Sequence, residues 1–278
     1  MAPKVLLYDT TLRDGMQGEG MSLTVDEKVR VAHALDGLGI HFVEAGFPSS
    51  NPKEEALFDL LSRETFEHAE IAAFGMTRRK DAGAEEDEGL RVLAACFAPV
   101  CTLVGKTWSL HLEKVTRVDP EENVRMIADS VGFLCGEGKR VIYDAEHFFD
   151  AFAADDAYAM RCLRAAAEAG AENLTLCDTN GATMPSRVAE VTARVVAELG
   201  DAVQIGIHTH DDSGCGVANA LVPTYGWLGS GETLHSSSTR WAVSVRRPSS
   251  SGGTTSKPSL SWRSGRIVTR FALPQRSP

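Results

Sequence analysis

The stretch VQIGIHTHDDSGCGVANALV, residues 203–222, has the pattern of a buried strand that ends in polar groups and leads into a helix. Its first half is short, apolar on both faces and rich in β-branched residues, which is typical of a strand inside a parallel sheet. Polar side chains, His208, His210, Asp211 and Asp212, follow at its end. A strand followed by a helix predicts an α/β protein if the unit recurs along the chain.

Six units of the same kind precede this one. The seven expected strands span residues 4–10, 41–47, 70–76, 100–106, 140–146, 173–178 and 204–210. Between them lie amphipathic segments with helix signals, such as Thr24 as an N-cap, Pro52 at a first helical position and Gly39 at a helix end. Units spaced roughly thirty residues apart predict a (β/α)8 TIM barrel, a fold of about 250 residues.

A Rossmann-type open sheet is the alternative to the barrel. That fold places a glycine-rich phosphate-binding turn after its first strand. The corresponding segment here, DTTLRDGMQGEG, contains glycines and several charges but no G-x-G-x-x-G pattern. The sequence therefore favours the barrel.

Charge is divided unevenly along the chain, whose formal net charge is -10 over 278 residues. Residues 1–222 hold 20 Lys+Arg and 37 Asp+Glu, a net of -17, whereas residues 223–278 hold 8 and 1, a net of +7. An acidic main part argues against nucleic acid as the partner, because phosphate binding requires a basic surface.

Cysteine usage and the N-terminal residues indicate a cytoplasmic protein. None of the six cysteines forms a C-x-x-C pair and most stand in apolar runs, as reduced, buried thiols do. The N-terminus leads almost at once into a strand, and no run of 18 apolar residues occurs. We therefore expect neither export nor membrane insertion.

Polar and ionisable residues gather at one end of the expected strands. In a TIM barrel this carboxyl end carries the function. The candidates there are Asp9, Arg13, Asp14, Glu44, Lys106, Tyr143, Asp144, Glu146, His147, Asp178, Thr179, Asn180, His208, His210, Asp211 and Asp212. The opposite ends carry fewer such groups, so the sequence predicts a functional site at the carboxyl rim.

His208 and His210 stand two apart on a strand, so both rings leave the same face. They can bind one divalent ion or serve as hydrogen-bonded core histidines. Asp14 offers a carboxylate from the first strand, which lies two positions from the seventh in a closed eight-stranded barrel. Two imidazoles and a carboxylate suit Mn, Fe, Zn or Mg. The sequence therefore predicts a metal site formed by these three residues.

Three further residues have two interpretations each. Arg13 can stabilise an enolate or alkoxide oxygen beside a metal, or form a solvated pair with Asp14. Glu146 can act as an acid/base group or as a hydrogen-bond partner. Thr179 can donate to a substrate carboxylate or cap the next helix.

Five motifs in this order carry a family resemblance: YDTTLRDGMQGEG, FVEAGFPSSNPKE, VIYDAEHFFD, LCDTNGATMP and IGIHTHDDSG. They resemble the metal-dependent acyl-CoA aldolase/lyase superfamily of TIM barrels, the DRE-TIM metallolyases. This superfamily includes isopropylmalate, homocitrate and citramalate synthases and hydroxymethylglutaryl-CoA lyase. Within it, EAGFPSSNPKE and YDAEHFFD are most similar to the citramalate synthase branch.

The resemblance implies a role for each matching residue. It implies a metal site whose ligands are Asp14, His208 and His210. It implies catalytic or substrate-binding roles for a second group: Arg13 at the keto oxygen and developing enolate, Glu44 as support for that arginine, Thr179 at the carboxylate of the 2-oxo acid, Glu146 as the acid near acetyl-CoA, and Tyr143 at the border of the 2-oxo acid pocket.

The resemblance also implies a reaction, which is a Claisen condensation of acetyl-CoA with pyruvate that gives citramalate in isoleucine and leucine biosynthesis. A divalent metal (Mn, Mg or Zn) is the implied cofactor, and a homodimer is the implied assembly. The alternatives are a 2-isopropylmalate or homocitrate synthase, or an impaired barrel that only binds metal or a partner subunit.

The sequence departs from the family pattern at two places. HTHDD stands where the family usually has H-x-H-N-D, with Asp211 at the asparagine position. After residue 222 the resemblance ends, and residues 223–278 contain 13 Ser, 5 Pro and a single acid. This composition does not favour packing.

We therefore expect residues 1–222 to form a pyruvate carboxyltransferase/HMGL-like TIM-barrel catalytic domain. We interpret residues 223–278 as an aberrant basic tail that is disordered or read out of frame. The eighth β/α unit, with the asparagine ligand of the family, is then lost. An incomplete barrel exposes two strand edges, and we expect the chain as written to fold poorly or to have weak activity.

Overall fold

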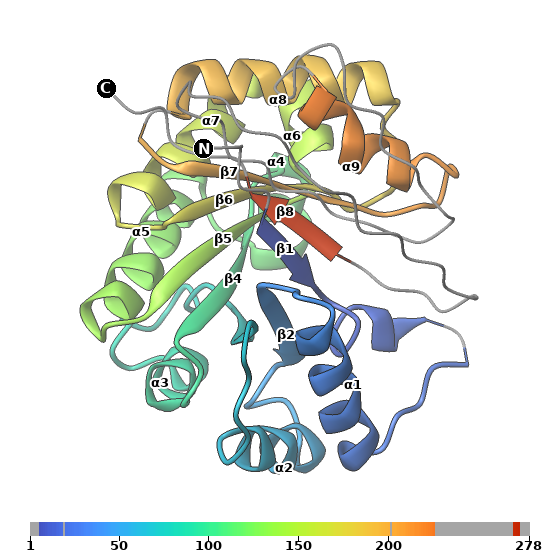
Figure 1. Ribbon diagram of the computed structural model, residues 1–278. Coiled ribbons are helices and arrows are strands. Elements are labelled where there is room, and N and C mark those ends of the chain that lie inside the picture. The colour runs from blue at the N-terminus through green and yellow to red at the C-terminus, as the bar shows by residue number, and fades with distance from the viewer. Residues whose placement is uncertain (1–5, 19, 201, 226–268, 273–278) are drawn as a thin grey trace.

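The computed structural model describes residues 6–18, 20–200, 202–225 and 269–272, in which seven parallel strands surround a barrel axis (Figure 1). These strands are β1 (Leu6–Asp9), β2 (Phe42–Gly46), β3 (Glu70–Met76), β4 (Val100–Lys106), β5 (Arg140–Glu146), β6 (Asn173–Asp178) and β7 (Gln204–Thr209). All seven expected strands are confirmed, and β3 to β6 have the expected bounds. Residues 4 and 5 of the first expected strand lie outside the described residues.

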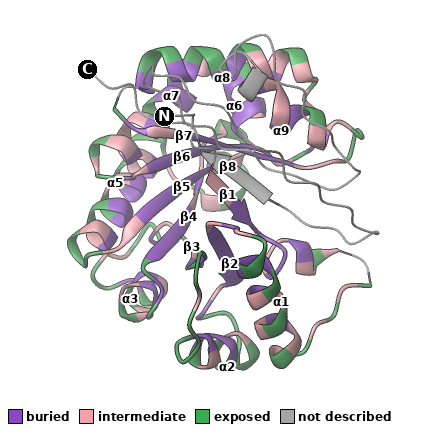
Figure 2. Cartoon of the chain, viewed as in Figure 1, coloured by how far each residue is buried: buried purple, intermediate pink, exposed green. Residues whose placement is uncertain are grey.

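Helices cover the outside of the barrel and turn their buried sides toward the strands (Figure 2). The α-helices are α1 (Val25–Gly37), α2 (Pro52–Leu61), α3 (Glu88–Ala95), α4 (Ser109–His111), α5 (Pro120–Gly136), α6 (Phe148–Ala154), α7 (Asp156–Glu168), α8 (Pro185–Leu199) and α9 (Gly216–Tyr225). Two short helical turns, η1 (Gly15–Gln17) and η2 (Leu112–Thr116), lie at the carboxyl rim.

The barrel is closed by a strand of unusual direction. β8 (Thr269–Ala272) lies between β7 and β1 and runs antiparallel to both. The eighth strand of a complete (β/α)8 barrel is parallel to its neighbours. The prediction of a TIM barrel with seven β/α units and no normal eighth unit is therefore confirmed for the described part of the chain.

The expectation of two exposed strand edges is wrong for the residues that pair with β8. All four residues of β1 have a partner in it, from Leu6 with Ala272 to Asp9 with Thr269, and Gly206 and Ile207 of β7 have one too. The interpretation of residues 223–278 as a disordered or out-of-frame tail stays a prediction, because most of them lie outside the described residues.

The alternation of side chains along each strand divides the core into two layers. Inside the barrel, the buried side chains of Tyr8, Phe42, Ala72, Val100 and Ile142 form one cluster. The larger cluster lies between strands and helices and takes the residues next to these in sequence, such as Val43, Cys101 and Tyr143. A residue's place on a strand thus decides whether it faces the barrel interior or the helices.

Local signals fix the helices where the sequence predicts them. The Thr24 hydroxyl accepts the N–H of Glu27, and the Glu27 carboxylate accepts the N–H of Thr24 (2.7 Å), which forms a capping box at the start of α1. Gly39 follows the end of α1 with φ 77°, a conformation that favours glycine. The expected cap and the expected stop are both confirmed.

All six cysteines are free thiols, and burial raises the pKa of Cys101 and of Cys162 to about 12. These two thiols are therefore protonated and inert at neutral pH. Among the described residues, no helix has the length and apolarity needed to cross a membrane.

Asp36 anchors the segment before β3. Its carboxylate accepts the backbone N–H groups of Glu67 (3.0 Å), His68 (2.7 Å) and Ala69 (2.7 Å). Burial opposes the charged form, but these three bonds outweigh burial and lower the pKa of Asp36 below its ordinary value of 3.8. The carboxylate form is thus the one that stabilises the fold.

We predict that Asp36→Ala lowers the free energy of unfolding by about 3 kcal/mol at pH 7, because three N–H groups, of which that of Ala69 is buried, lose a charged acceptor. Since the native pKa of Asp36 is depressed, its contribution is complete above the ordinary value and decreases as the pH falls through the native pKa. Urea unfolding followed by circular dichroism should therefore show a difference between wild type and variant that narrows below about pH 4. Asp59→Asn, at an exposed pair with Arg63, is the control. A difference independent of pH contradicts the prediction.

We predict that a chain ending at Tyr225 is less stable than the full chain, since it leaves β1 and β7 without the β8 pairing. Unpaired edges also template association between chains. The expected result is a melting temperature lower by about 5 °C, with larger species in size-exclusion chromatography coupled to light scattering. Equal melting temperatures and equal masses for the two chains would show that β8 contributes nothing to closure.

Candidate metal centre and surrounding site

Arg13 and Asp14 lie in a tight turn after β1, at the carboxyl rim of the barrel. The carbonyl oxygen of Thr10 accepts the N–H groups of Arg13 (3.2 Å) and Gly15 (3.0 Å). The Asp9 carboxylate accepts the N–H of Thr11 (2.8 Å). These bonds fix the backbone of the turn, from which Arg13 contacts β2 and Asp14 contacts the end of β7.

The Asp14 carboxylate lies beside two histidines from the end of β7. Its Oδ2 is 3.1 Å from Nε2 of His208 and 3.4 Å from Nε2 of His210. The two imidazole centroids are 5.1 Å apart, and one ligand atom from each of the three residues lies within 4.8 Å of the others. Two imidazole nitrogens and a carboxylate oxygen at this spacing form a donor set that fits a divalent cation.

The electrostatics of this set favour a charged Asp14. Burial opposes ionisation, but hydrogen bonds to His208 and His210 and the nearby Arg13 guanidinium outweigh it and hold the pKa of Asp14 well below its usual range. Asp14 is therefore an anion at neutral pH, which suits it as a candidate metal ligand.

Asp144 is a buried neighbour of this set to which the sequence assigns no role beyond its position at a strand end. Its Oδ2 is 3.9 Å from Nδ1 of His208, on the side of the ring opposite Asp14. That Nδ1 is buried and has no hydrogen-bond partner among the described residues. Asp144, Cys177 and His208 form a second group of potential ligands, all buried. Asp144 shares a face of β5 with Glu146, and this two-residue spacing is the signal that places it inside the barrel.

Arg13 is held from two sides. Its Nε donates to Oε1 of Glu44, a fully buried carboxylate on β2, and its Cζ lies 4.0 Å from the centroid of the Phe74 ring. Its Nη1 is 3.5 Å from Oδ1 of Asp14. The structure thus brings together Glu44, Arg13 and Asp14.

Glu146, at the end of β5, lies among basic and aromatic side chains. Its Oε2 forms an ion pair with Nζ of Lys106 and is 3.6 Å from Nδ1 of His111. The His111 ring is 4.6 Å from that of His147 and 5.4 Å from that of Trp108. Burial and the neighbouring His147 lower the pKa of His111, so this imidazole is neutral at neutral pH. No role for Trp108 or His111 could be predicted from the sequence, because they follow β4 in a short helical segment without a recognised motif.

Thr179 follows β6 and contacts the segment after β5. Its hydroxyl oxygen accepts the backbone N–H of His147 (2.8 Å). The N-cap of α8 is Met184, so the interpretation of Thr179 as a helix cap is wrong. The hydroxyl proton can be donated to a second acceptor, and the role in carboxylate binding stays a prediction.

Tyr143 is not brought to the site. It lies on the outer face of β5, is 0% exposed and packs in the layer between strands and helices. Its ring covers Gly105 so closely that a Cβ at that glycine would lie 2.5 Å from Cε2. A side chain on this face cannot border a pocket in the barrel interior. The implied substrate role of Tyr143 is therefore corrected, and Asp144 holds the inward position instead.

Three acids of the rim serve the backbone of loops. Asp9 accepts the N–H of Thr11, Asp178 accepts the N–H of Thr183 (3.3 Å), and Asp211 accepts the N–H of Gly216 (2.7 Å). These acids help to set the loops that present the ligand residues.

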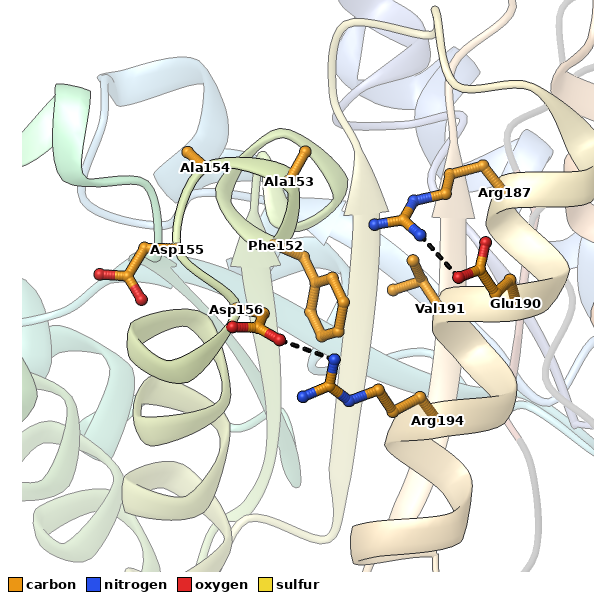
Figure 3. A pocket seen from close by; sticks show the side chains of 9 residues that line it. All are labelled: Phe152, Ala153, Ala154, Asp155, Asp156, Arg187, Glu190, Val191 and Arg194. Carbon is orange, nitrogen blue, oxygen red and sulfur yellow. Dashed lines mark hydrogen bonds and ion pairs between the residues drawn. The ribbon is translucent and has the colours of Figure 1, made fainter.

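A surface cavity of about 470 Å³ lies apart from these residues, where α8 faces the junction of α6 and α7 (Figure 3). Phe152 lines it, with Cζ of Arg194 at 5.0 Å and Cζ of Arg187 at 5.8 Å from its ring. Both arginines are paired, with Asp156 (2.6 Å) and Glu190 (2.8 Å). No predicted site residue lines this cavity, and both of its arginines already pair with an acid.

The fold and the carboxyl-rim ligand set define a TIM barrel with a candidate divalent-metal centre. The chain belongs to the HMGL-like family, whose model matches residues 4–225. The matched region includes the seven parallel strands and every candidate site residue.

Curated relatives narrow the similarity within the family. The chain is 46% identical over 217 residues to the (R)-citramalate synthase of Geobacter sulfurreducens, an alignment that covers 78% of this chain and 41% of the relative. It is 43% identical over 222 residues to the (R)-citramalate synthase of Aquifex aeolicus, covering 80% and 42%. A 2-isopropylmalate synthase of Sulfolobus acidocaldarius is 33% identical, covering 78% and 53%. The chain thus spans less than half the length of the citramalate synthases it matches.

Solved structures agree in fold. The HMG-CoA lyase of Bacillus subtilis superposes with a TM-score of 0.65 at 19% identity, covering 82% of this chain and 76% of that one. At this identity the likeness concerns the barrel alone.

We predict that the chain binds one Mn²⁺ through Asp14, His208 and His210, measured by isothermal titration calorimetry after treatment with a chelator. Asp14→Asn or His210→Ala should weaken binding at least about 100-fold, since even partners that only orient metal ligands contribute 10- to 100-fold. Asp212→Asn is the matched control, because it removes a nearby exposed carboxylate outside the ligand set. Equal affinities for all four proteins would rule out this metal site.

Proposed function

We propose that this barrel condenses acetyl-CoA with a small 2-oxo acid, namely pyruvate, and hydrolyses the thioester to release CoA and citramalate. The observation that carries the proposal is the set of Asp14, His208 and His210 beside Arg13, in a chain 43–46% identical to several (R)-citramalate synthases. The reaction would serve isoleucine and leucine biosynthesis, as the resemblance implies.

Asp14, His208 and His210 are the residues that would hold the divalent ion, Mn, Mg or Zn. A cation bound there supplies Lewis acidity that polarises the carbonyl group of a 2-oxo acid. The anionic state of Asp14 and the buried position of His208 support this assignment.

Arg13 and Thr179 would bind and orient the 2-oxo acid. The Arg13 guanidinium, fixed by Glu44 and Phe74, would donate to the keto oxygen as negative charge develops on it. Thr179 would donate its hydroxyl proton to the carboxylate of pyruvate, while its oxygen accepts the N–H of His147. Both roles follow from donors that are already oriented by protein contacts.

Glu146 would accept a proton from the methyl group of acetyl-CoA. The methyl carbon then forms a bond with the keto carbon of pyruvate as the C=O π bond breaks, and the keto oxygen gains a proton that balances the one accepted by Glu146. Water attacks the thioester carbonyl, the C–S bond breaks, and CoA leaves as the thiol. Lys106 and His111 flank the Glu146 carboxylate, so proton transfer to it requires rearrangement of the ion pair with Lys106.

Two alternatives follow from specific observations. The 33% identity to a 2-isopropylmalate synthase supports a bulkier 2-oxo acid as substrate, and a homocitrate synthase of Methanopyrus kandleri is 34% identical. The antiparallel β8, in place of a parallel eighth strand, supports an impaired barrel that binds only metal or a partner subunit. We further propose that the protein acts in the cytoplasm as a homodimer, which light scattering would distinguish from a monomer.

We predict that the purified chain with Mn²⁺ releases CoA from acetyl-CoA faster with pyruvate than with 2-oxoisovalerate or 2-oxoglutarate, as measured with a thiol reagent. Arg13→Gln should lower kcat about 10²- to 10³-fold, because it removes a charged donor to the developing oxyanion. Arg187→Gln, at the surface cavity of Figure 3, is the matched arginine control and should retain full activity.

Each of the other possible results of the CoA-release assay supports one of the alternative functions. Preference for 2-oxoisovalerate or 2-oxoglutarate assigns the isopropylmalate or homocitrate reaction. Mn²⁺ binding without CoA release for any of the three acids assigns the impaired, metal-binding barrel.

A further inference from the structure

A chain of buried hydrogen bonds crosses the barrel interior beneath Arg13. The hydroxyl of Thr102 on β4 lies 2.5 Å from the phenol oxygen of Tyr8 on β1. The Tyr8 hydroxyl in turn donates to Oε2 of Glu44 on β2 (2.6 Å), whose Oε1 accepts Nε of Arg13. Three strands thus contribute to a path that ends at the guanidinium.

The direction of the chain follows from proton counting. A carboxylate can only accept, and a phenol has one proton to donate. Because the Tyr8 proton is directed at Glu44, the Thr102 hydroxyl must donate to Tyr8. Each donor therefore increases the acidity of the next, and the path polarises toward the charged end at Glu44.

Burial makes the hydrogen bonds along this path energetically important. Glu44 and Thr102 are 0% exposed and Tyr8 is 4% exposed. A buried carboxylate oxygen that loses its donor incurs a desolvation penalty that water cannot relieve without entering the core. The hydrogen bond that Tyr8 donates to Oε2 therefore helps to hold the buried Glu44 carboxylate in place.

The two carboxylate oxygens of Glu44 accept hydrogen bonds from different residues. The terminal torsion of a glutamate is broad, so one contact alone leaves the carboxylate free to rotate. The Tyr8 bond to Oε2 fixes this rotation and directs Oε1 toward Nε of Arg13. Arg13 is thereby held in the plane that stacks on Phe74 and faces Asp14.

We propose that Tyr8 is a positioning residue for Arg13, acting through Glu44, with Thr102 as the group that orients Tyr8. The effect on catalysis rests on the proposed function, whereas the effect on the Arg13 guanidinium does not. A displaced donor at a developing oxyanion loses much of its effect on the rate, because catalysis depends on geometry fixed in advance.

The chain contains a matched control for this proposal. Tyr143 is a second buried tyrosine in a barrel strand, but it faces the helices, and no described residue forms a hydrogen bond with its hydroxyl. Tyr8→Phe and Tyr143→Phe therefore remove the same atom from opposite faces of the sheet. Only the first should affect Arg13.

The primary experiment measures hydrogen exchange of the Arg13 Nε–H by ¹⁵N NMR in the full chain. We expect exchange at least about tenfold faster in Tyr8→Phe, because the salt bridge opens more often, and exchange equal to wild type in Tyr143→Phe. Thr102→Val, which keeps the Tyr8 bond to Glu44 but removes its donor, should show a smaller increase. Unchanged exchange in Tyr8→Phe overturns the proposal, and if that variant does not fold, unchanged exchange in Thr102→Val does so.

Kinetics then connect the position of Arg13 with turnover. For CoA release with pyruvate we expect kcat to fall about tenfold in Tyr8→Phe, with the Mn²⁺ affinity unchanged, and no change in Tyr143→Phe. If wild type releases no CoA but Arg13 exchanges faster in Tyr8→Phe than in wild type, the positioning role is supported and the proposed function is refuted. Faster exchange with an unaltered kcat would overturn the catalytic part of the inference.

Discussion

The contact of Asp14 with His208 and His210 is the constraint on which the site depends, because it joins the first strand of the barrel to the seventh. Residues so far apart in sequence meet only if the sheet curls far enough to bring β1 near β7. The tight turn after β1 and the two-residue spacing of the histidines then direct the three side chains to one place. The curvature of the sheet is therefore what brings the three candidate ligands together.

The barrel interior is polar near the rim and apolar below it, and this gradient separates stability from chemistry. Phe42, Ala72, Val100 and Ile142 pack in the lower layer. Above them lie two buried acids. Glu44 pairs with Arg13, and Asp144 lies 3.9 Å from Nδ1 of His208. Buried carboxylates of this kind require compensation in full. Their placement explains why the arginine and the histidine beside them have so little freedom.

Most of the fold and of the ligand set could be predicted from the sequence, since both follow from local patterns. Buried parallel strands are continuous apolar runs, and two histidines at a spacing of two share a face. The family resemblance implies a pocket role for Tyr143, but the alternation of side chains along β5 is the better guide. The inward position of Glu146 implies that Asp144 faces inward and Tyr143 faces the helices.

The contacts that could not be predicted from the sequence join segments that lie far apart along the chain. Tyr8 meets Thr102 across the barrel interior, and neither residue carries a local signal for the other. β8 is four residues long and pairs with strands on both sides in the antiparallel direction. The choice of partner for such a short strand depends on which edges remain open, and a local pattern contains no information about that.

The antiparallel β8 has a consequence for how the molecule is made. Leu6 pairs with Ala272, so β1 waits for a segment that is translated after all seven parallel strands. Contacts this distant in sequence form slowly because a long loop must close before any bond is gained. The edge of β1 is therefore available to chaperones, or to neighbouring nascent chains, until residues 269–272 have been translated, and closure of the barrel follows the pairing of the seven parallel strands.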